Sequence, residues 1–158
     1  MNINRYTDIY NEDSSLRQYQ QKAKKEIFES WDDVDNVMFQ MPTGTGKTKL
    51  FTSIIKDIND YSLRRKEAVK ILIIAHRTEL INQINEHLEK YKVPRNIIAG
   101  GHEKHYKYPV SIASIQTITN ANNIRKAQKL NVQFIIIDEA HHALSDSYQS
   151  FLRQFPDA

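Results

Sequence analysis

Cysteine is absent from this chain of 158 residues. Disulfide bridges and metal centres held by thiolates, such as structural zinc sites and iron–sulfur clusters, are therefore excluded. Glycine and proline contribute only four residues each, which excludes collagen-like and low-complexity sequences. No apolar run is long enough to cross a bilayer, and the first residues lack the apolar stretch of a secretory signal. We therefore expect a cytoplasmic protein without a membrane partner.

The composition that is present is that of a folded domain. Hydrophobic residues make up 40% of the chain and charged residues 26%, which is ordinary for a globular domain, and the length suits a single one. The net charge of +3 permits a polyanionic partner without requiring one. We expect residues 1–13 to form a polar lead-in and residues 14–158 to form the domain.

Apolar residues follow two patterns that alternate along the chain. Short continuous apolar runs predict strands, and apolar residues at helical spacing predict helices. The predicted strands are 37–41, 70–75, 96–99, 110–113 and 132–137, and the predicted helices are 16–31 (capped by Ser14 or Ser15), 47–60, 78–91, 116–130 and 145–155. This alternation predicts an α/β fold with a mainly parallel sheet. Such folds bind ligands at the carboxyl ends of their strands.

A glycine-rich segment follows the first predicted strand and opens a helix. Its residues are Thr43, Gly44, Thr45, Gly46, Lys47 and Thr48. Strand, loop and helix in this order are the context of a phosphate-binding P-loop, whose backbone N–H groups face a phosphate. We expect Lys47 to reach the β- and γ-phosphates of ATP and the Thr48 hydroxyl to bind Mg²⁺. The general motif has glycine where Met41 stands, and the alternative is a glycine turn with an unrelated lysine.

Two carboxylates, Asp138 and Glu139, follow the most apolar predicted strand. The strand would deliver them to the carboxyl edge of the sheet. There Asp138 could hold Mg²⁺, partly through water, and Glu139 could orient and deprotonate an attacking water. The alternative is a pair of acids in the first turn of a helix, where negative charge is favourable in any case. With the P-loop, this pair gives Lys47, Asp138 and Glu139 as catalytic candidates.

The segments Met41 to Thr48 and Asp138 to His141 resemble motifs I and II of the superfamily-two helicases and translocases, the second in its DEAH form. In that superfamily the first P-loop position is commonly not glycine, so Met41 agrees with it. The resemblance implies a P-loop NTPase with a RecA-like three-layer α/β/α fold, which hydrolyses ATP to move along nucleic acid. The doubled histidine, His141 and His142, resembles members related to restriction-enzyme motor subunits and repair translocases, which favours DNA over RNA.

Weaker motifs resemble other parts of the same superfamily. Leu16 to Gln20 resembles the Q motif, which implies that Gln20 contacts adenine. The nucleic-acid contacts implied by resemblance are His76 and Arg77 in motif Ia, and Ser114, Gln116 and Thr117 in the next motif. The first two also stand between a predicted strand and a helix, which suits a nucleic-acid phosphate. The resemblance assigns coupling between the nucleotide site and a second domain to His141.

The family's motif III strand and its second RecA-like domain, with the arginine finger, have no counterpart after the acidic pair. The chain therefore resembles an N-terminal fragment of a longer protein or a truncated gene. We expect weak or no ATPase activity and no unwinding from it alone. The missing strand would lie between the P-loop strand and the acidic-pair strand. We therefore expect that these two strands close up and pair directly, that another chain fills the gap, or that the fold is only marginally stable. A nucleotide-binding regulatory or scaffold module without turnover remains the alternative function, while a small-molecule phosphotransferase is disfavoured because it leaves the histidines after the acidic pair unexplained.

Overall fold

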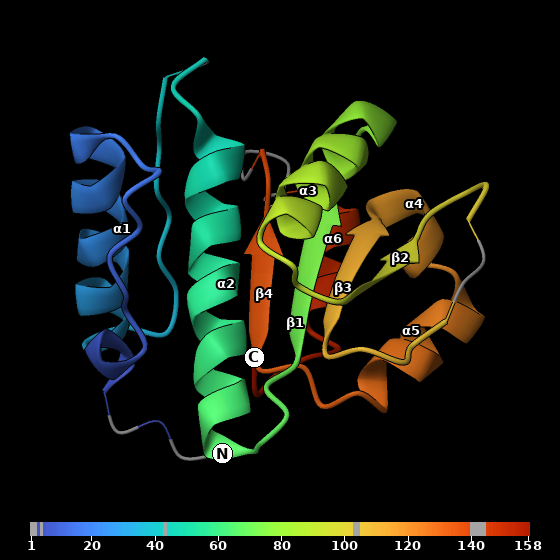
Figure 1. Cartoon of the computed structure of the whole chain (residues 1–158). Helices are drawn as coiled ribbons and strands as arrows, with labels where there is room; N and C mark the ends of the chain where they lie inside the picture. Colours follow the sequence, from blue (N-terminus) through green and yellow to red (C-terminus); the bar gives the residue numbers. More distant parts are fainter. Residues whose placement is uncertain (1–2, 4, 43, 103–104, 140–144) are drawn as a thin grey trace. The chain divides into compact units, whose positions relative to one another are not determined.

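The computed structural model describes residues 3, 5–42, 44–102, 105–139 and 145–158. The chain divides into two compact units, Met1–Glu67 and Ala68–Ala158. Figure 1 shows the helices of the first unit in blue to green and the sheet of the second in green to red. Among the described residues, no helix combines the length and the apolar character needed to cross a membrane.

The first unit is helical. It consists of a short 3₁₀ turn, η1 (Tyr6–Asp8), and the helices α1 (Gln18–Trp31) and α2 (Lys47–Arg65). Arg17 occupies the N-cap position of α1, so the predicted cap at Ser14 or Ser15 is wrong. The α1 face that carries Ala23, Ile27 and Phe28 is buried, as its helical spacing predicts. Helix α2 runs past the predicted end at residue 60 to Arg65.

The strand predicted at 37–41 is not formed. These residues belong to no helix or strand, and Met38 and Phe39 have exposed fractions of 71% and 40%. A strand is stabilised by hydrogen bonds to a neighbour, and no strand in the described part of the chain pairs with this segment. The apolar composition of residues 37–41 favours a strand, but a strand forms only where a neighbouring strand pairs with it. The two strands that we expected on either side of the missing motif III strand therefore do not close up.

The second unit contains a four-stranded parallel sheet, which confirms the predicted α/β class. Its strands are β1 (Ile71–Ala75), β2 (Arg95–Ile98), β3 (Val110–Ser114) and β4 (Phe134–Ile137), in the order β2-β3-β1-β4. The central strand β1 is buried at all five positions, as expected for a parallel strand covered on both faces. Ala75 pairs with Ser114 and Ile74 with Ile137. This register brings the carboxyl ends of β1, β3 and β4 to one edge.

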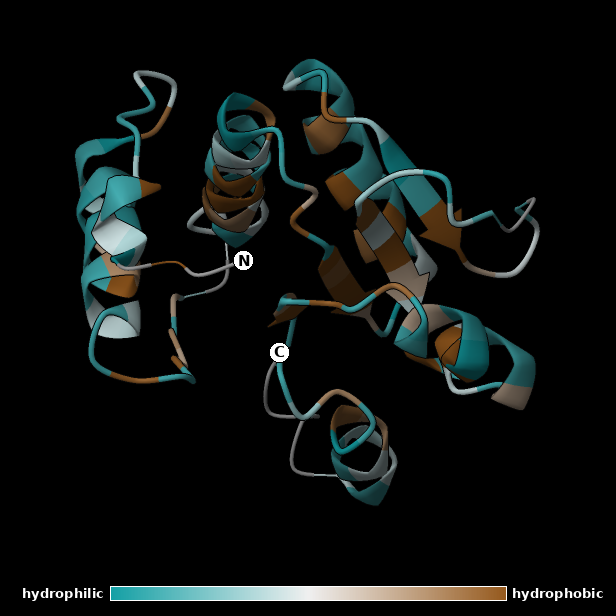
Figure 2. Ribbon diagram, turned by 90° about the horizontal axis from the view of Figure 1, so that it is seen from below, coloured by the Kyte–Doolittle hydropathy of each residue, from teal (hydrophilic) through white to brown (hydrophobic). Residues whose placement is uncertain are grey.

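Helices cover both faces of this sheet. They are α3 (Thr78–Lys90), α4 (Ile115–Ile118), α5 (Ala121–Gln128) and α6 (Asp146–Leu152). In Figure 1, α3 lies in front of the sheet and α6 behind it. Leu72 and Ile74 of β1 pack in one apolar cluster with Ala127 of α5 and Phe151 of α6, and Figure 2 shows apolar residues concentrated on the strands. The predicted helix 116–130 is divided because the Asn120 side chain caps a new helix by accepting from the Asn122 N–H.

Candidate functional site

The glycine-rich loop leads directly into α2. Gly44 and Gly46 have φ values of +80° and +82°, in the left-handed region, and Gly46 is the N-cap residue of α2. Alternating left-handed residues allow successive N–H groups to converge on an anion. A Cβ on Gly46 would also collide with the amide of Gln20, whereas one on Gly44 would meet nothing. Gly46 is therefore favoured by its left-handed backbone, and a side chain at this position would also have to displace the Gln20 amide.

Helix α1 holds the loop through two backbone carbonyls, those of Thr45 and Gly46. The Tyr19 hydroxyl donates a hydrogen bond of 2.7 Å to the Thr45 oxygen, and Gln20 Nε2 donates one of 3.2 Å to the same oxygen. The C=O and N–H of a trans peptide point in opposite directions. Because the Thr45 carbonyl is turned toward α1, the N–H of Gly46 in the same peptide points away from it. Tyr19 is 43% exposed.

Gln20 is buried against the loop. Its Nε2 also donates to the Gly46 oxygen at 3.1 Å, and its Oε1 accepts from the Arg17 N–H at 2.8 Å. Both ends of the amide are therefore occupied by backbone groups of this chain. This arrangement makes Gln20 a positioning residue for the loop, and its contact with adenine stays a prediction.

Lys47 and Thr48 lie in the first turn of α2, where both side chains are half-buried. Four other lysines of the same unit have carboxylate partners, among them Lys24 with Asp57 and Lys56 with Asp60. Lys47 makes no ion pair or side-chain hydrogen bond to any described residue. Its ammonium group is thus available to an anion at the N-terminus of the helix. Thr43, the first predicted loop residue, lies outside the described residues.

The acidic pair lies where β4 ends. Asp138 continues the pairing with β1 by donating its N–H to the Ile74 oxygen at 3.1 Å, and its buried Oδ1 accepts from the Glu139 N–H at 2.9 Å. Glu139 has a φ of +56°, which costs a non-glycine residue roughly 1–2 kcal/mol. Such strained positions cluster at functional sites. The Asp138 carboxylate and the Thr48 hydroxyl are oxygen donors of the kind that Mg²⁺ takes, so their chemistry fits the predicted ion.

The candidate nucleic-acid contacts meet at the same edge of the sheet. His76 and Arg77 follow β1 and are exposed, while Gln116 follows β3 and donates from Nε2 to the His76 oxygen at 3.3 Å. Ser114 is buried, and its Oγ caps α4 by accepting from the N–H of the half-buried Thr117 at 3.1 Å. The structure thus brings all five predicted residues together, with His76, Arg77 and Gln116 exposed. The predicted coupling residue His141 lies outside the described residues.

The comparisons with known proteins agree with this arrangement. The family model described as "Type III restriction enzyme, res subunit" matches residues 13–158. The chain belongs to this family. It is 33% identical over 149 residues to the Saccharomyces cerevisiae protein named "Putative ATP-dependent helicase IRC3", with 89% of this chain and 21% of that protein aligned. It is 30% identical over 144 residues to the Schizosaccharomyces pombe protein named "Putative mitochondrial ATP-dependent helicase irc3", with 89% of this chain and 23% of that protein aligned.

The res-family chain thus spans about a fifth of the length of these relatives. Its parallel sheet and its family membership establish a RecA-like domain of the helicase type, related to restriction motor subunits. The names of both yeast relatives describe ATP-dependent helicases.

One residue beside the acidic pair of this res-family domain was not predicted. Tyr148 of α6 is buried, and burial together with the charges of Glu139 and Asp138 raises the pKa of its hydroxyl. In a sequence, a tyrosine at helical spacing is interpreted as a core residue, so no sequence signal indicates that Tyr148 lies near the acidic pair. In the structure it lies near enough to the acidic pair for the charges of Glu139 and Asp138 to act on its hydroxyl.

A buried ion pair was also not predicted. Lys24 Nζ lies 2.7 Å from Asp57 Oδ2, 2.7 Å from the Asn11 oxygen and 3.0 Å from Ser53 Oγ. The Asn11 N–H donates to the same Asp57 oxygen at 2.8 Å. Burial raises the pKa of Asp57 and outweighs the opposing hydrogen bond from Lys24. The cluster ties the polar lead-in to both α1 and α2.

Proposed function

We propose that this chain is the first motor domain of an ATP-hydrolysing nucleic-acid translocase. The loop from Thr43 to Thr48 binds the phosphates of ATP, and Gln20 contacts the adenine. Asp138 and Glu139 serve hydrolysis. In the longer protein a second RecA-like domain completes the site, and His141 couples the two domains.

One observation carries this proposal. The loop before α2 has two glycines with left-handed backbone, and its Thr45 carbonyl is held by two hydrogen bonds. Lys47, which follows the loop, has no partner among the described residues. A helix N-terminus and a lysine are both positive, which suits a polyphosphate. The role of Lys47 is to neutralise charge on the β- and γ-phosphates.

The acidic pair supports hydrolysis as well as binding. Asp138 is held by its hydrogen bond from the Glu139 N–H, which fixes the direction of the carboxylate. Glu139 then accepts the proton of the attacking water. Mg²⁺ held by Asp138 and Thr48 would neutralise phosphate charge when bound.

The track of the motor is nucleic acid, with DNA favoured over RNA. His76, Arg77 and Gln116 are exposed side chains at one edge of the sheet. All three carry N–H groups that can donate to phosphate oxygens, and Arg77 adds a positive charge. The cytoplasm is the proposed location.

A thermal melt of the chain with and without Mg·ATP or Mg·ADP tests the nucleotide site, because a ligand that binds only the folded state raises the midpoint. Lys47→Ala removes the proposed phosphate contact. Lys49→Ala, two residues along α2, is the matched control because Lys49 contacts the Ser15 oxygen instead.

We expect nucleotide to raise the midpoint of the wild type and of Lys49→Ala, and not that of Lys47→Ala. Equal shifts in all three proteins would contradict phosphate binding by this loop. In the longer protein, ATPase activity that DNA fails to stimulate would favour a regulatory module without translocation.

A further inference from the structure

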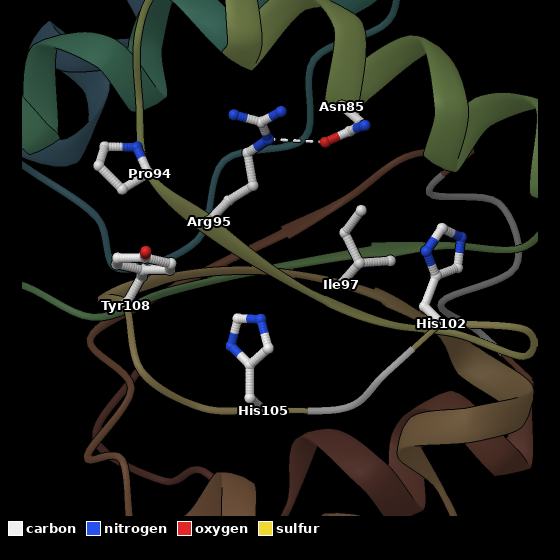
Figure 3. Close-up of a pocket in the computed structure, with 7 residues that line it drawn as sticks. All are labelled: Asn85, Pro94, Arg95, Ile97, His102, His105 and Tyr108. Atoms are coloured by element: carbon white, nitrogen blue, oxygen red, sulfur yellow. Dashed lines mark hydrogen bonds between the residues drawn. The ribbon is translucent and has the colours of Figure 1, made fainter.

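A pocket lies along the outer side of β2, the end strand of the sheet in the second unit. Its volume is about 400 Å³, which is within the range of roughly 300–1,000 Å³ typical of small-molecule sites. Figure 3 shows Arg95 and Asn85 on one side of it and the rings of Tyr108, His105 and His102 on the other. No carboxylate belongs to its lining among the described residues.

A buried asparagine fixes one ring of this pocket. Asn96 Nδ2 donates to the Tyr108 oxygen at 2.8 Å and to Ser111 Oγ at 2.9 Å. Its Oδ1 accepts from the Tyr108 N–H and lies 3.0 Å from His105 Nδ1. Because Oδ1 is an acceptor, Nδ1 of His105 carries the hydrogen. The opposite nitrogen, Nε2, is left to interact with a ligand.

The rings of His105 and Tyr108 stand at a steep angle. The centroids of His105 and Tyr108 are 6.0 Å apart, and their planes meet at 73°. A flat ligand that stacks on one ring therefore presents its edge to the other. Lys107 Nζ lies 5.3 Å from the centre of the Tyr108 ring, so a positive charge accompanies the aromatic surface. Flat rings and cations together are the features that recognise single-stranded nucleic acid.

The opposite side of the pocket is lined by the guanidinium of Arg95, which hydrogen bonds hold in place. Arg95 Nε donates to Asn85 Oδ1 at 2.6 Å, and Nη1 donates to the Val93 oxygen at 3.2 Å. Its Nη2 pairs with Glu89 Oε2 at 2.5 Å, but the Glu89 side chain is 71% exposed. An ion pair with such an exposed partner is weak, so a phosphate can replace the carboxylate without moving the guanidinium.

The position of the pocket also suits a nucleic-acid strand. His102 follows the carboxyl end of β2, and the exposed contacts His76, Arg77 and Gln116 follow the carboxyl ends of β1 and β3. A single strand of nucleic acid that lies across this edge would reach His102, which follows β2 and lines the pocket. The pocket then continues along β2 to Arg95, at the start of the strand.

We infer that this pocket binds one nucleotide of a single-stranded nucleic acid. The base stacks on Tyr108 or His105, and its edge or phosphate meets Asn85 and Arg95. This inference rests on the proposed function in that the domain must meet nucleic acid. It adds a contact beside the carboxyl edge, on the outer side of the sheet.

The test is the binding of a short fluorescent oligothymidylate to the 158-residue chain, measured by anisotropy. Tyr108→Leu removes the ring and retains the backbone bonds to Asn96, whereas Tyr108→Phe retains the ring and is the matched control. Base–aromatic stacking predicts roughly 5- to 150-fold weaker binding for Tyr108→Leu and unchanged binding for Tyr108→Phe. If Tyr108→Leu does not fold, His105→Ala, at an exposed position, is measured instead, with a loss of the same sign expected.

Equal affinity of the wild type and the ring-less variant would overturn the inference, and so would a wild type that binds no oligothymidylate. Competition by inorganic phosphate as strong as that by the oligonucleotide would mean an anion site without base recognition and would also overturn it. Displacement by polyglutamate with equal strength would indicate a protein partner instead. The Mg·ATP melt of the same proteins reports on the nucleotide site separately, so failure of the pocket and failure of the proposed function are distinguishable.

Discussion

Replacing Lys24 by methionine tests whether the buried cluster stabilises the first unit. The Lys24 side chain has no exposed surface and that of Asp57 has 3%. Methionine has a similar length and no charge, so the variant leaves the Asp57 carboxylate buried with only the Asn11 N–H as a hydrogen-bond donor. The Asn11 oxygen and Ser53 Oγ also lose their lysine partner.

Removing one member of a buried ion pair typically costs about 3–5 kcal/mol, because the other charge remains buried without compensation. For a chain of this size, 1 kcal/mol shifts the melting temperature by about 2–4 °C. We therefore expect the melting temperature of Lys24→Met to fall by about 6–20 °C. Urea unfolding followed by circular dichroism gives the free energy directly.

The loss should depend on pH in a definite direction. Burial raises the pKa of Asp57 above that of the unfolded chain, so the folded variant takes up a proton more readily than the unfolded one. Stability of Lys24→Met should therefore recover as the pH falls through the raised pKa toward the ordinary value of about 3.9. Above that window the full loss persists.

Two further variants make the reasoning refutable. Lys24→Met combined with Asp57→Leu removes both charges and should be more stable than Lys24→Met alone. Lys22→Met alters a lysine two positions earlier, whose side chain is 80% exposed and pairs with Glu26, and should unfold like the wild type. A loss below about 1 kcal/mol in Lys24→Met, or a double variant no better than the single one, would show that the cluster does not stabilise the fold as described.

Two other substitutions have defined outcomes. Gly46→Ala places a Cβ at a φ of +82° and against Gln20; chemical unfolding should show a loss of more than about 1 kcal/mol, and calorimetry weaker Mg·ATP binding. Glu139→Gln should leave ATP binding in calorimetry unchanged and abolish phosphate release by the longer protein, and full turnover would refute its role as base. The same substitution should lower the raised pKa of Tyr148 toward about 10 in an NMR titration, because one of the two nearby negative charges is gone. Since the folded pKa of Tyr148 is raised, its contribution to stability is present below about pH 10 and is lost as the pH rises through the raised value.

Sequence patterns predicted the parts of the structure that depend on local order. The apolar runs identified the four strands that the described part of the second unit contains. The rule that ligands bind at the carboxyl ends of parallel strands directed attention to the edge where Asp138 and His76 lie, whereas Gln116 came from the resemblance. The positions after strands are informative because parallel strands share their direction. These features follow from spacing within a short window of the chain.

The features that were missed depend on partners far away in the sequence. The segment 37–41 has the composition of a strand but no neighbouring strand among the described residues. Lys24 and Asp57 are polar residues on separate helices, and only the folded unit shows that they pair. The pocket beside β2 likewise combines α3, the strand and the loop that follows it. Composition alone does not encode such pairings.

The Thr45 carbonyl couples the conformation of the phosphate-binding loop to the docking of the α1 N-terminus. Tyr19 and Gln20 of α1 both donate to it, so the order of the loop and the docking of the α1 N-terminus stabilise each other. Such coupling is reciprocal: if docked α1 favours the phosphate-binding shape, occupancy of the loop favours docked α1 by the same factor. Hydrogen exchange at the first amides of α1 should therefore slow when nucleotide binds, although these amides do not themselves touch phosphate. Hydrogen exchange in α1 would therefore report whether the loop is occupied, although α1 is not part of the loop.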